Sequence, residues 1–319
     1  MRAHAGRSVQ VSGLPHTLVY GLSMAPKPNA GRPRMPEPGQ LLAGRYRVGG
    51  RLAAGGMGAV FEARDEQAGE DVALKLLHPE LCIDREMHRR FRREASILAS
   101  LLHPAVVRVK DVGETADGLL FTVMERLRGE TLLARIERAR FVDPRELWPI
   151  VEDVCAGLGA AHAHGVLHGD VKPANIFLVE DEAGPSLTRR VGAKLVDFGT
   201  SKVHGLERLT RTGEVVGTPT YMAPELLTGQ GAIDARMDVY AMGVVLYEAL
   251  VGRPPFVERN PGRLMFRIAT GQVDPLGEKR PDLSDALRQV VERAMAPKAV
   301  ERFASAGELA QAMHEAAFP

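Results

Sequence analysis

The sequence predicts an α+β protein of two lobes, with a small β-rich lobe followed by a larger helical lobe. Three observations predict this class. The stretch after Leu41 is glycine-rich and strand-like, helical patterns dominate from Gly129 onward, and 319 residues are enough for two packed cores. The chain therefore divides into a tail at 1–40, a small lobe at 41–128 and a large lobe at 129–319.

The composition is that of a soluble globular protein without a dominant charge. Apolar residues make up 45% and charged residues 25% of the chain. The 41 basic and 40 acidic residues leave a net charge of +1, which argues against nucleic acid or a membrane surface as a partner. No apolar run could span a bilayer, and Gly, Pro and His interrupt any N-terminal signal peptide. The two cysteines, Cys82 and Cys155, lack metal or redox spacing and favour a reduced, cytoplasmic setting.

The tail is basic and rich in proline. Five prolines fall within 26–38, and the residues before Gln40 include five basic residues and one acidic residue. Such a segment buries too little apolar surface to fold, so we expect it to be disordered. The alternative is that translation starts at Met24 or Met35.

The small lobe is expected to contain strands and one helix. Residues 46–65 predict two strands joined by a glycine-rich loop, and 71–78 predict a third strand. The segment 85–102 has the apolar spacing of a helix. Two further strands, 105–115 and 118–127, are expected to pair through an Asp-Gly turn.

The large lobe shows clear helix boundaries and one buried helix. Asp143 is a typical N-cap, Pro144 suits the first helical position, and Gly165 ends that helix. The run 239–252 has no polar face. It therefore predicts a helix that is buried on all sides.

A hairpin in the large lobe is expected to gather oxygen ligands. If the strand-like segments "NIFLV" and "AKLV" pair, Asn175 and Asp197 meet at the open end, one turn from Asp170. Oxygen donors at this low count suit Mg²⁺, which substrate phosphates and water complete. Lys172 would neutralise a transferring phosphoryl group, and Asp170 would accept a proton. The alternative is a polar loop with an incidental aspartate.

Two features of the small lobe also point to phosphate. Glycines at 55, 56 and 58 leave backbone N–H groups free to approach phosphate oxygens, although ordinary β-turns can look alike. Lys75 lies inside an apolar strand and Glu94 on the apolar stripe of the next helix, where unpaired charges are costly. We expect the two to pair and to hold Lys75 toward the phosphates. Alternatively, both side chains reach water.

Beyond these local patterns, a set of motifs follows a recognisable order. The sequence reads "AAGGMGAV", "VALK", Glu94, "HGDVKPAN", "DFG" at 197–199 and "APE" at 223–225, and then "DVYAMG" and Arg302. In this order the motifs resemble the Hanks-type protein kinases, specifically the bacterial serine/threonine kinases, over about residues 45–315. The resemblance implies the bilobal protein-kinase fold.

The resemblance also implies an ATP site between the lobes. The lid over ATP would consist of Leu52, Ala53, Ala54, Gly55, Gly56, Met57, Gly58, Ala59 and Val60. The adenine contacts, the gatekeeper and the hinge backbone would come from Val60, Ala73, Met124, Glu125 and Leu127. Lys75, paired with Glu94, would hold the α- and β-phosphates.

In the large lobe, the resemblance implies a role for each polar residue of "HGDVKPAN". Asp170 would be the catalytic base that orients the substrate hydroxyl, and Lys172 would contact the γ-phosphate. Asn175 and Asp197 would hold magnesium. Lys172 together with "GTPTYMAPE" indicates a serine/threonine rather than a tyrosine kinase.

Two further contacts are implied outside that loop. Glu225 would pair with Arg302. Asp238 would hold the backbone of the catalytic loop from the start of the buried helix.

The chain departs from the family pattern at two positions. Ala53 stands where the first lid glycine is usual, and Gly169 stands where most members have the arginine that receives the activation-loop phosphate. Because Gly169 carries no charge, phosphate on Thr210 and Thr212 is expected to matter little for activity. Thr218 resembles the threonine that contacts the catalytic aspartate and lysine, so its loss is expected to impair the enzyme.

The sequence therefore predicts an ATP- and Mg²⁺-dependent serine/threonine protein kinase that acts on protein substrates. Ala53 and Gly169 leave a pseudokinase scaffold as one alternative. A small-molecule kinase of the same superfold is the other, because some of these have glycine beside the base. The length of 200–222 and the "APE" motif favour a protein substrate. The sequence does not indicate an oligomeric state.

Overall fold

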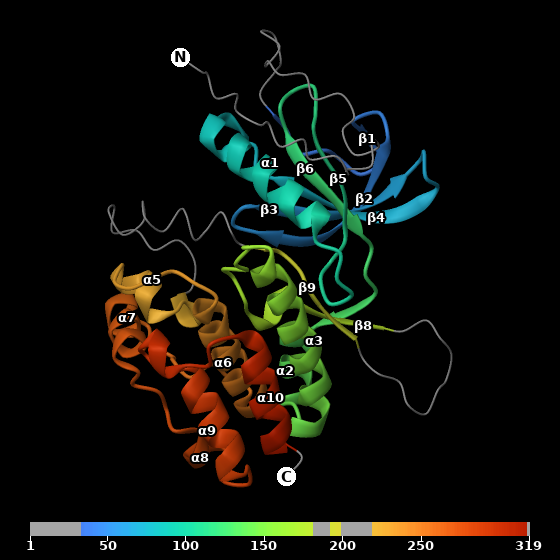
Figure 1. The fold of residues 1–319 in the computed structure, drawn as a ribbon. Coiled ribbons are helices and arrows are strands. Elements are labelled where there is room, and N and C mark those ends of the chain that lie inside the picture. Colours follow the sequence, from blue (N-terminus) through green and yellow to red (C-terminus); the bar gives the residue numbers. More distant parts are fainter. Residues whose placement is uncertain (1–32, 181–191, 199–218, 318–319) are drawn as a thin grey trace, which may run out of the picture.

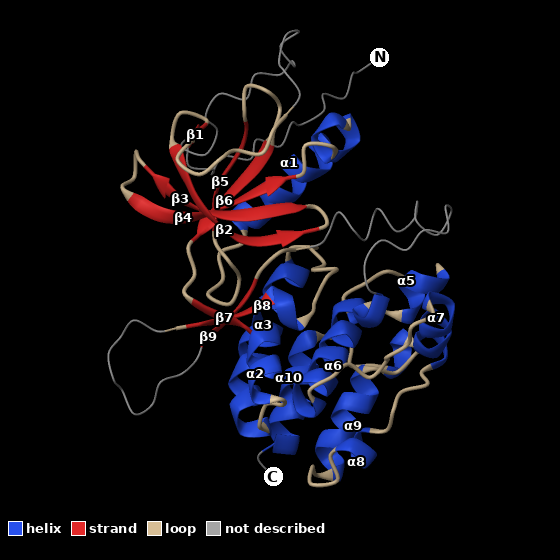
Figure 2. Ribbon diagram, turned by 180° about the vertical axis from the view of Figure 1, so that it is seen from behind, coloured by secondary structure: helices blue, strands red, loops and turns tan. Residues whose placement is uncertain are grey.

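The computed structural model describes residues 33–180, 192–198 and 219–317 and has two lobes (Figure 1). The upper, small lobe is a twisted β-sheet with helix α1 (Arg85–Ser100) packed against it. The lower, large lobe is mainly helical, as the view from behind also shows (Figure 2). The predicted bilobal α+β class is confirmed.

The sheet of the small lobe is antiparallel throughout, with the strand order β1-β2-β3-β4-β6-β5. Its strands are β1 (Leu41–Leu42), β2 (Tyr46–Gly55), β3 (Gly58–Asp65), β4 (Glu70–Leu77), β5 (Val109–Glu114) and β6 (Leu120–Glu125). A short 3₁₀ turn, η1 (Leu81–Ile83), precedes α1. The strands and the helix expected between 46 and 127 are therefore all present.

Glycine is sterically required at Gly58, the first residue of β3. A Cβ at this position would lie 1.9 Å from the carbonyl oxygen of Leu76 on β4. Only glycine allows the two strands to approach this closely. The sheet then buries Leu74 and Leu76 completely in the small-lobe core.

Residues 33–40, which the sequence analysis assigned to the tail, lie along the small lobe. The amide of Arg34 donates to Asp117 Oδ2 at 3.2 Å, in the turn between β5 and β6. The amide of Gly39 donates to the carbonyl of Val48 on β2 at 2.7 Å. The rest of the expected tail is outside the described residues.

The large lobe is built around the buried helix α6. Its helices are α2 (Leu132–Ala139), α3 (Pro144–Ala163), α5 (Pro224–Thr228), α6 (Arg236–Val251), α7 (Pro261–Thr270), α8 (Leu276–Lys279), α9 (Asp285–Ala294) and α10 (Ala306–Ala317). Its 3₁₀ turns are η2 (Pro173–Asn175), η3 (Pro219–Tyr221) and η4 (Ala299–Glu301). No helix in the described ranges is long and apolar enough to cross a membrane.

Helices α3 and α6 agree with the sequence predictions. Asp143 caps α3 by accepting from the amide of Arg145 at 2.9 Å, and Gly165 follows the helix with a φ of 70°. Every residue of α6 from Met237 to Leu250 is buried. The absence of a polar face on this helix therefore did indicate complete burial.

A second, smaller sheet lies where the lobes meet and positions the expected metal ligands. It has the order β7-β8-β9 and consists of β7 (Gly129–Thr131), β8 (Ile176–Val179) and β9 (Gly192–Leu195). Strands β8 and β9 are antiparallel, with Ile176 opposite Leu195. The predicted hairpin is confirmed. Asn175 therefore lies directly before one strand, and Asp197 lies two residues after the other.

Candidate active site

The loop between α3 and β8 brings three of the predicted catalytic side chains together. Lys172 Nζ donates to Asp170 Oδ2 at 2.8 Å. The amide nitrogen of Asn175 donates to the same oxygen at 3.0 Å and to the main-chain carbonyl of Asp170 at 2.8 Å. A carboxylate, an ammonium and a carboxamide thus form one connected group at the surface between the lobes.

Asp238, at the start of α6, holds the backbone of this loop from below. Its two carboxylate oxygens accept from the amides of His168 at 2.8 Å and Gly169 at 2.9 Å. His162 Nε2 also contacts Asp238 Oδ2 at 2.8 Å. The predicted role of Asp238 is confirmed. The contacting amides belong to the two residues before Asp170, so Asp238 fixes the backbone that leads to Asp170.

Gly169 adopts a backbone conformation that favours glycine. Its φ is 73°, in the left-handed region where a side chain adds strain. The backbone at this position, where most family members have arginine, therefore has a conformation that glycine adopts without strain.

Lys75 on β4 reaches across the lobe interface to Asp197. Its Nζ lies 2.8 Å from Asp197 Oδ1. Burial raises the pKa of the Asp197 carboxyl, but the charge and hydrogen bond of the Lys75 ammonium outweigh burial, so the net shift is downward. Asp197 is therefore ionised at neutral pH. The side chain of Glu94, the partner expected for Lys75, lies outside the part of α1 that is described.

Asn175 and Asp197 form a donor set that fits Mg²⁺. The amide of Val196 donates to the main-chain carbonyl of Asn175 at 2.9 Å, which joins the two ligand-bearing segments. Because the nitrogen of the Asn175 amide is engaged by Asp170, its oxygen is the atom available to a cation. One ionised carboxylate and one amide oxygen are what Mg²⁺ uses when phosphates and water complete its shell.

Sequence reasoning missed the contribution of His168. Burial lowers the pKa of this fully buried imidazole, so the ring is neutral at pH 7. The amide of Asp170 donates to its Nδ1 at 3.2 Å, so Nε2 carries the hydrogen and donates to the Val196 carbonyl at 3.3 Å. The ring also lies 4.4 Å from that of Phe198. His168 thereby links the backbone of Asp170 to the segment that carries Asp197.

The residues expected around adenine gather in one apolar cluster between the lobes. Ala73 and Met124 are opposite each other on β4 and β6 and are both buried. Val60 and Leu127 pack against the same cluster, together with Val196 from the large lobe. An apolar surface with hinge backbone at its edge suits a flat aromatic base.

His78, which the sequence analysis did not identify as part of the site, anchors the glycine-rich turn. The amide of His78 donates to the Met57 carbonyl at 3.0 Å, and its ring nitrogen Nε2 lies 2.9 Å from the Gly55 carbonyl. Both contacts use main-chain carbonyls of the turn. Leu52 to Gly56 are exposed, as a lid requires.

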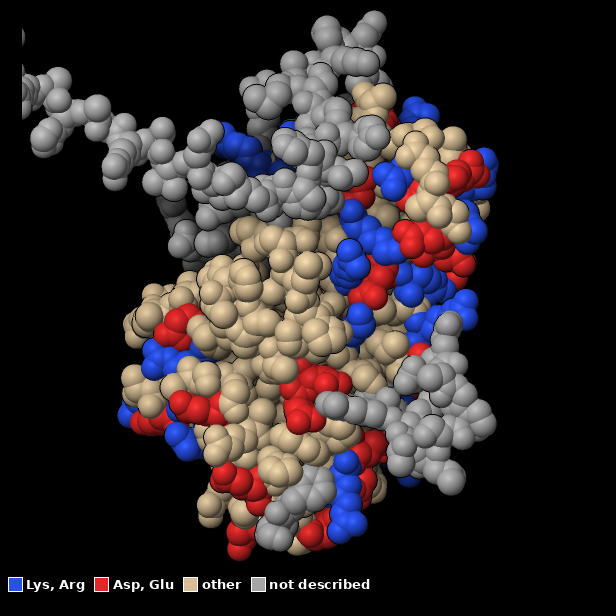
Figure 3. All heavy atoms as spheres, turned by 45° about the vertical axis from the view of Figure 1, so that its right-hand side comes forward, with Lys and Arg blue, Asp and Glu red and all other residues tan. Residues whose placement is uncertain are grey.

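Ion pairs hold the hinge to both lobes. Lys194 on β9 contacts Glu125 at 2.6 Å, and Arg126 contacts Glu62 on β3 at 2.5 Å. Figure 3 shows positive and negative side chains interleaved over the right-hand part of the small lobe, where neither sign dominates.

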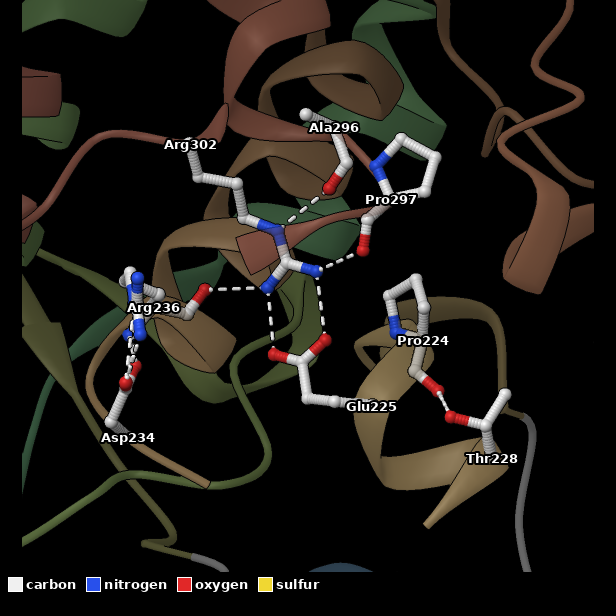
Figure 4. A network of polar contacts seen from close by, with 8 residues as sticks. All are labelled: Pro224, Glu225, Thr228, Asp234, Arg236, Ala296, Pro297 and Arg302. Atoms are coloured by element: carbon white, nitrogen blue, oxygen red, sulfur yellow. Dashed lines mark hydrogen bonds and ion pairs between the residues drawn. The ribbon is translucent and has the colours of Figure 1, made fainter. Parts of the chain in front are cut away.

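A buried ion pair holds the first turn of α5 against the segment that carries Arg302 (Figure 4). Arg302 donates to both carboxylate oxygens of Glu225, at 2.7 and 2.8 Å, and both side chains are almost fully buried. Its remaining donors bind the carbonyls of Arg236, Ala296 and Pro297. The predicted pair is confirmed.

Part of the predicted site falls outside the described residues. This part consists of the side chain of Glu94, Gly199 of the "DFG" motif and the loop residues Thr210, Thr212 and Thr218. The predictions about these threonines therefore remain predictions.

The small lobe contributes an apolar cluster and a glycine-rich turn, and the large lobe contributes Asp170, Lys172, Asn175 and Asp197. A β-rich lobe and a helical lobe that meet in this way define the bilobal protein-kinase fold. Comparison with known families is more specific. The chain belongs to the protein kinase family, whose protein kinase domain matches residues 46–316.

The relatives are bacterial serine/threonine kinases. The chain is 38% identical over 273 residues to serine/threonine-protein kinase PknB of Mycolicibacterium smegmatis, covering 85% of this chain and 42% of that protein. It is 38% identical over 275 residues to PknH of Mycobacterium tuberculosis, covering 86% and 42%. The PknI kinase domain of M. tuberculosis has a similar structure, with a TM-score of 0.70 and 32% identity over 89% of this chain and 99% of that one. The chain spans less than half the length of PknB and PknH.

Proposed function

We propose that this protein is a serine/threonine protein kinase that transfers the γ-phosphate of ATP to protein hydroxyls with the help of Mg²⁺. The observation that carries the proposal is the meeting of Asp170, Lys172 and Asn175 opposite the Lys75–Asp197 pair. The names of the relatives support a hydroxyl of serine or threonine as the acceptor. The buried, unpaired cysteines fit a reducing compartment, in which we expect the protein to act.

Each group then has one task in the transfer. The apolar cluster around Met124 binds the adenine, and Lys75 turns from Asp197 to the α- and β-phosphates. Asn175 and Asp197 would hold Mg²⁺, which neutralises charge that develops on the phosphates. Asp170 orients the acceptor hydroxyl and takes its proton.

Lys172 completes this set of roles. Its ammonium, now bonded to Asp170, can turn to the γ-phosphate as charge shifts toward the leaving oxygen. Catalysis of this kind rests on positioning and electrostatics rather than on covalent chemistry. Loss of one group should therefore reduce the rate without unfolding the protein.

The experiment compares wild type with Asp170→Asn and Lys75→Met. Each variant is incubated with γ-labelled ATP and a generic basic protein, and folding is checked by urea unfolding. We expect each variant to lose phosphoryl transfer by about a hundredfold or more. Transfer by Asp170→Asn at the wild-type rate would exclude this residue as the base.

The same assay separates the alternatives. A panel of aminoglycosides and sugars, offered in place of the protein, tests for a small-molecule kinase. A wild-type protein that labels neither kind of acceptor would be a pseudokinase scaffold. The buried Glu225–Arg302 pair, which fixes α5 and the turn before it, favours an extended protein acceptor.

A further inference from the structure

His78 follows directly after β4 and contacts the glycine-rich turn between β2 and β3 at two points. Its main-chain amide donates to the Met57 carbonyl at 3.0 Å, which extends the pairing of β3 with β4 by one residue. Its imidazole Nε2 lies 2.9 Å from the Gly55 carbonyl. Because a carbonyl oxygen only accepts, Nε2 carries the hydrogen and donates it. One residue therefore holds both arms of the turn.

The two arms differ in how tightly packing fixes them. On the β3 arm, a Cβ at Gly58 would lie 1.9 Å from the Leu76 carbonyl oxygen, so this backbone is held close to β4. On the β2 arm, a Cβ at Gly56 would meet no atom within 4 Å, and the atom nearest to a Cβ at Gly55 is 4.0 Å away. Glycine backbone with space around it can adopt many conformations. Packing therefore does not set the orientation of the peptide between Gly55 and Gly56, and the hydrogen bond from His78 selects one.

The bond to the Gly55 carbonyl also sets the direction of the next amide. The C=O and N–H groups of a planar trans peptide point in opposite directions, so the Gly56 amide points away from the His78 ring. Side chains alternate between the two faces of an extended strand. Lys75 precedes His78 by three positions, so the two side chains emerge on opposite faces, and Lys75 reaches Asp197 across the lobe interface.

The imidazole extends from a backbone that is itself held in place. The amide of Leu81 donates to the His78 carbonyl at 2.9 Å, where η1 begins. Pro79 follows His78 directly and restricts its backbone to an extended conformation. A residue that is held in this way loses little conformational freedom when its side chain binds the turn.

We propose that His78 is a positioning residue for the nucleotide phosphates. Its ring directs the Gly56 amide toward the face of the sheet that carries Lys75, where this amide donates to a phosphate oxygen of ATP. If the turn adopts other orientations, the affinity for the phosphates falls in proportion to the population of the competent one. The inference rests on the proposed kinase function and concerns how the same site holds its nucleotide.

The test measures the binding of two ligands to the full chain by calorimetry, adenosine and a non-hydrolysable ATP analogue with Mg²⁺. In His78→Ala the affinity for the analogue should fall by about three- to tenfold, the contribution of one hydrogen bond. The affinity for adenosine, which has no phosphate, should stay unchanged. His78→Gln keeps an N–H donor near the place of Nε2 and should restore the affinity for the analogue to within about twofold of wild type.

His164→Ala is the matched control. His164 Nδ1 lies 2.9 Å from the Ala160 carbonyl at the end of α3, so this variant removes the same kind of ring-to-carbonyl contact in the large lobe. Both affinities should keep their wild-type values. Adenosine is the internal control for folding, because a general disturbance of the small lobe would weaken the binding of both ligands.

The outcomes separate this inference from the proposed function. If wild type binds neither ligand, the proposed kinase function fails. If His78→Ala binds both ligands as wild type does, or loses affinity for both alike, His78 does not position the phosphates and the kinase function stands. A His78→Gln variant that binds the analogue as weakly as His78→Ala would also overturn the role of the ring donor.

Discussion

Replacing Arg302 with methionine should destabilise the large lobe more than most single substitutions. The guanidinium is fully buried and makes two hydrogen bonds to Glu225 and three to main-chain carbonyls. It also lies 4.8 Å from the centre of the Tyr240 ring. Methionine fills part of the volume but replaces none of these bonds.

The expected cost follows from what remains buried. Arg302→Met leaves the Glu225 carboxylate without its counter-charge, and breaking a buried pair in this way costs about 3–5 kcal/mol. Glu225→Gln is milder, because one amide oxygen still accepts from the guanidinium, and it should cost about 1.5–3 kcal/mol. The double variant leaves no buried charge, so its cost should fall short of the sum by about 1–3 kcal/mol.

The free energy of unfolding can be measured by urea titration with tryptophan fluorescence. Trp148 is the single tryptophan of the chain and packs against His314 across α3 and α10, so it reports on the large lobe. Lys298→Met is the matched control, because it removes an exposed ion pair with Glu301 nearby in the chain and should change little. If the two single variants prove additive, the pair does not stabilise the lobe as argued here.

Three further predictions follow from other parts of the molecule. The Tyr240 hydroxyl is buried without a hydrogen-bond partner among the described residues, so Tyr240→Phe should leave stability unchanged or raise it by up to about 1–3 kcal/mol in the same urea titration. Burial lowers the pKa of His168, so the unfolded chain binds its proton first as pH falls. Between pH 7.5 and 5.5 wild type should therefore lose about 1.4 kcal/mol more than His168→Asn, and equal losses would contradict a neutral imidazole. Asp197→Ala should weaken Mg²⁺-dependent ATP binding more than Asn175→Ala, because a carboxylate contributes a full charge and a carboxamide only a dipole. ATP titrations at several Mg²⁺ concentrations test this, and equal losses of affinity in the two variants would contradict the reasoning.

The sequence predicted best where a local pattern decides the structure. The hairpin that brings Asn175 near Asp197 follows from two short strands and needs no knowledge of the rest of the chain. The burial of α6 follows from the lack of a polar face. The pairing of Glu225 with Arg302 came from the family resemblance, because no local pattern joins residues 77 positions apart.

The sequence did not reveal the hydrogen bonds between polar groups that lie far apart in the chain. His168 has no unusual neighbours in the sequence, and its neutral state depends on complete burial between α6 and Val196. A cavity beside Asp170 arises where several separate elements meet, so no single segment encodes it. Such features need three-dimensional structure, because burial and partners are set by tertiary packing.

Helix α6 anchors two neighbouring parts of the candidate site from one rigid element. Near its first turn Asp238 holds the loop that carries Asp170, and ten residues later Glu248 binds Tyr221 of η3. The two anchors are therefore about 15 Å apart along one rigid axis. A change that slides or rotates this helix would displace the Asp170 loop and Tyr221 together.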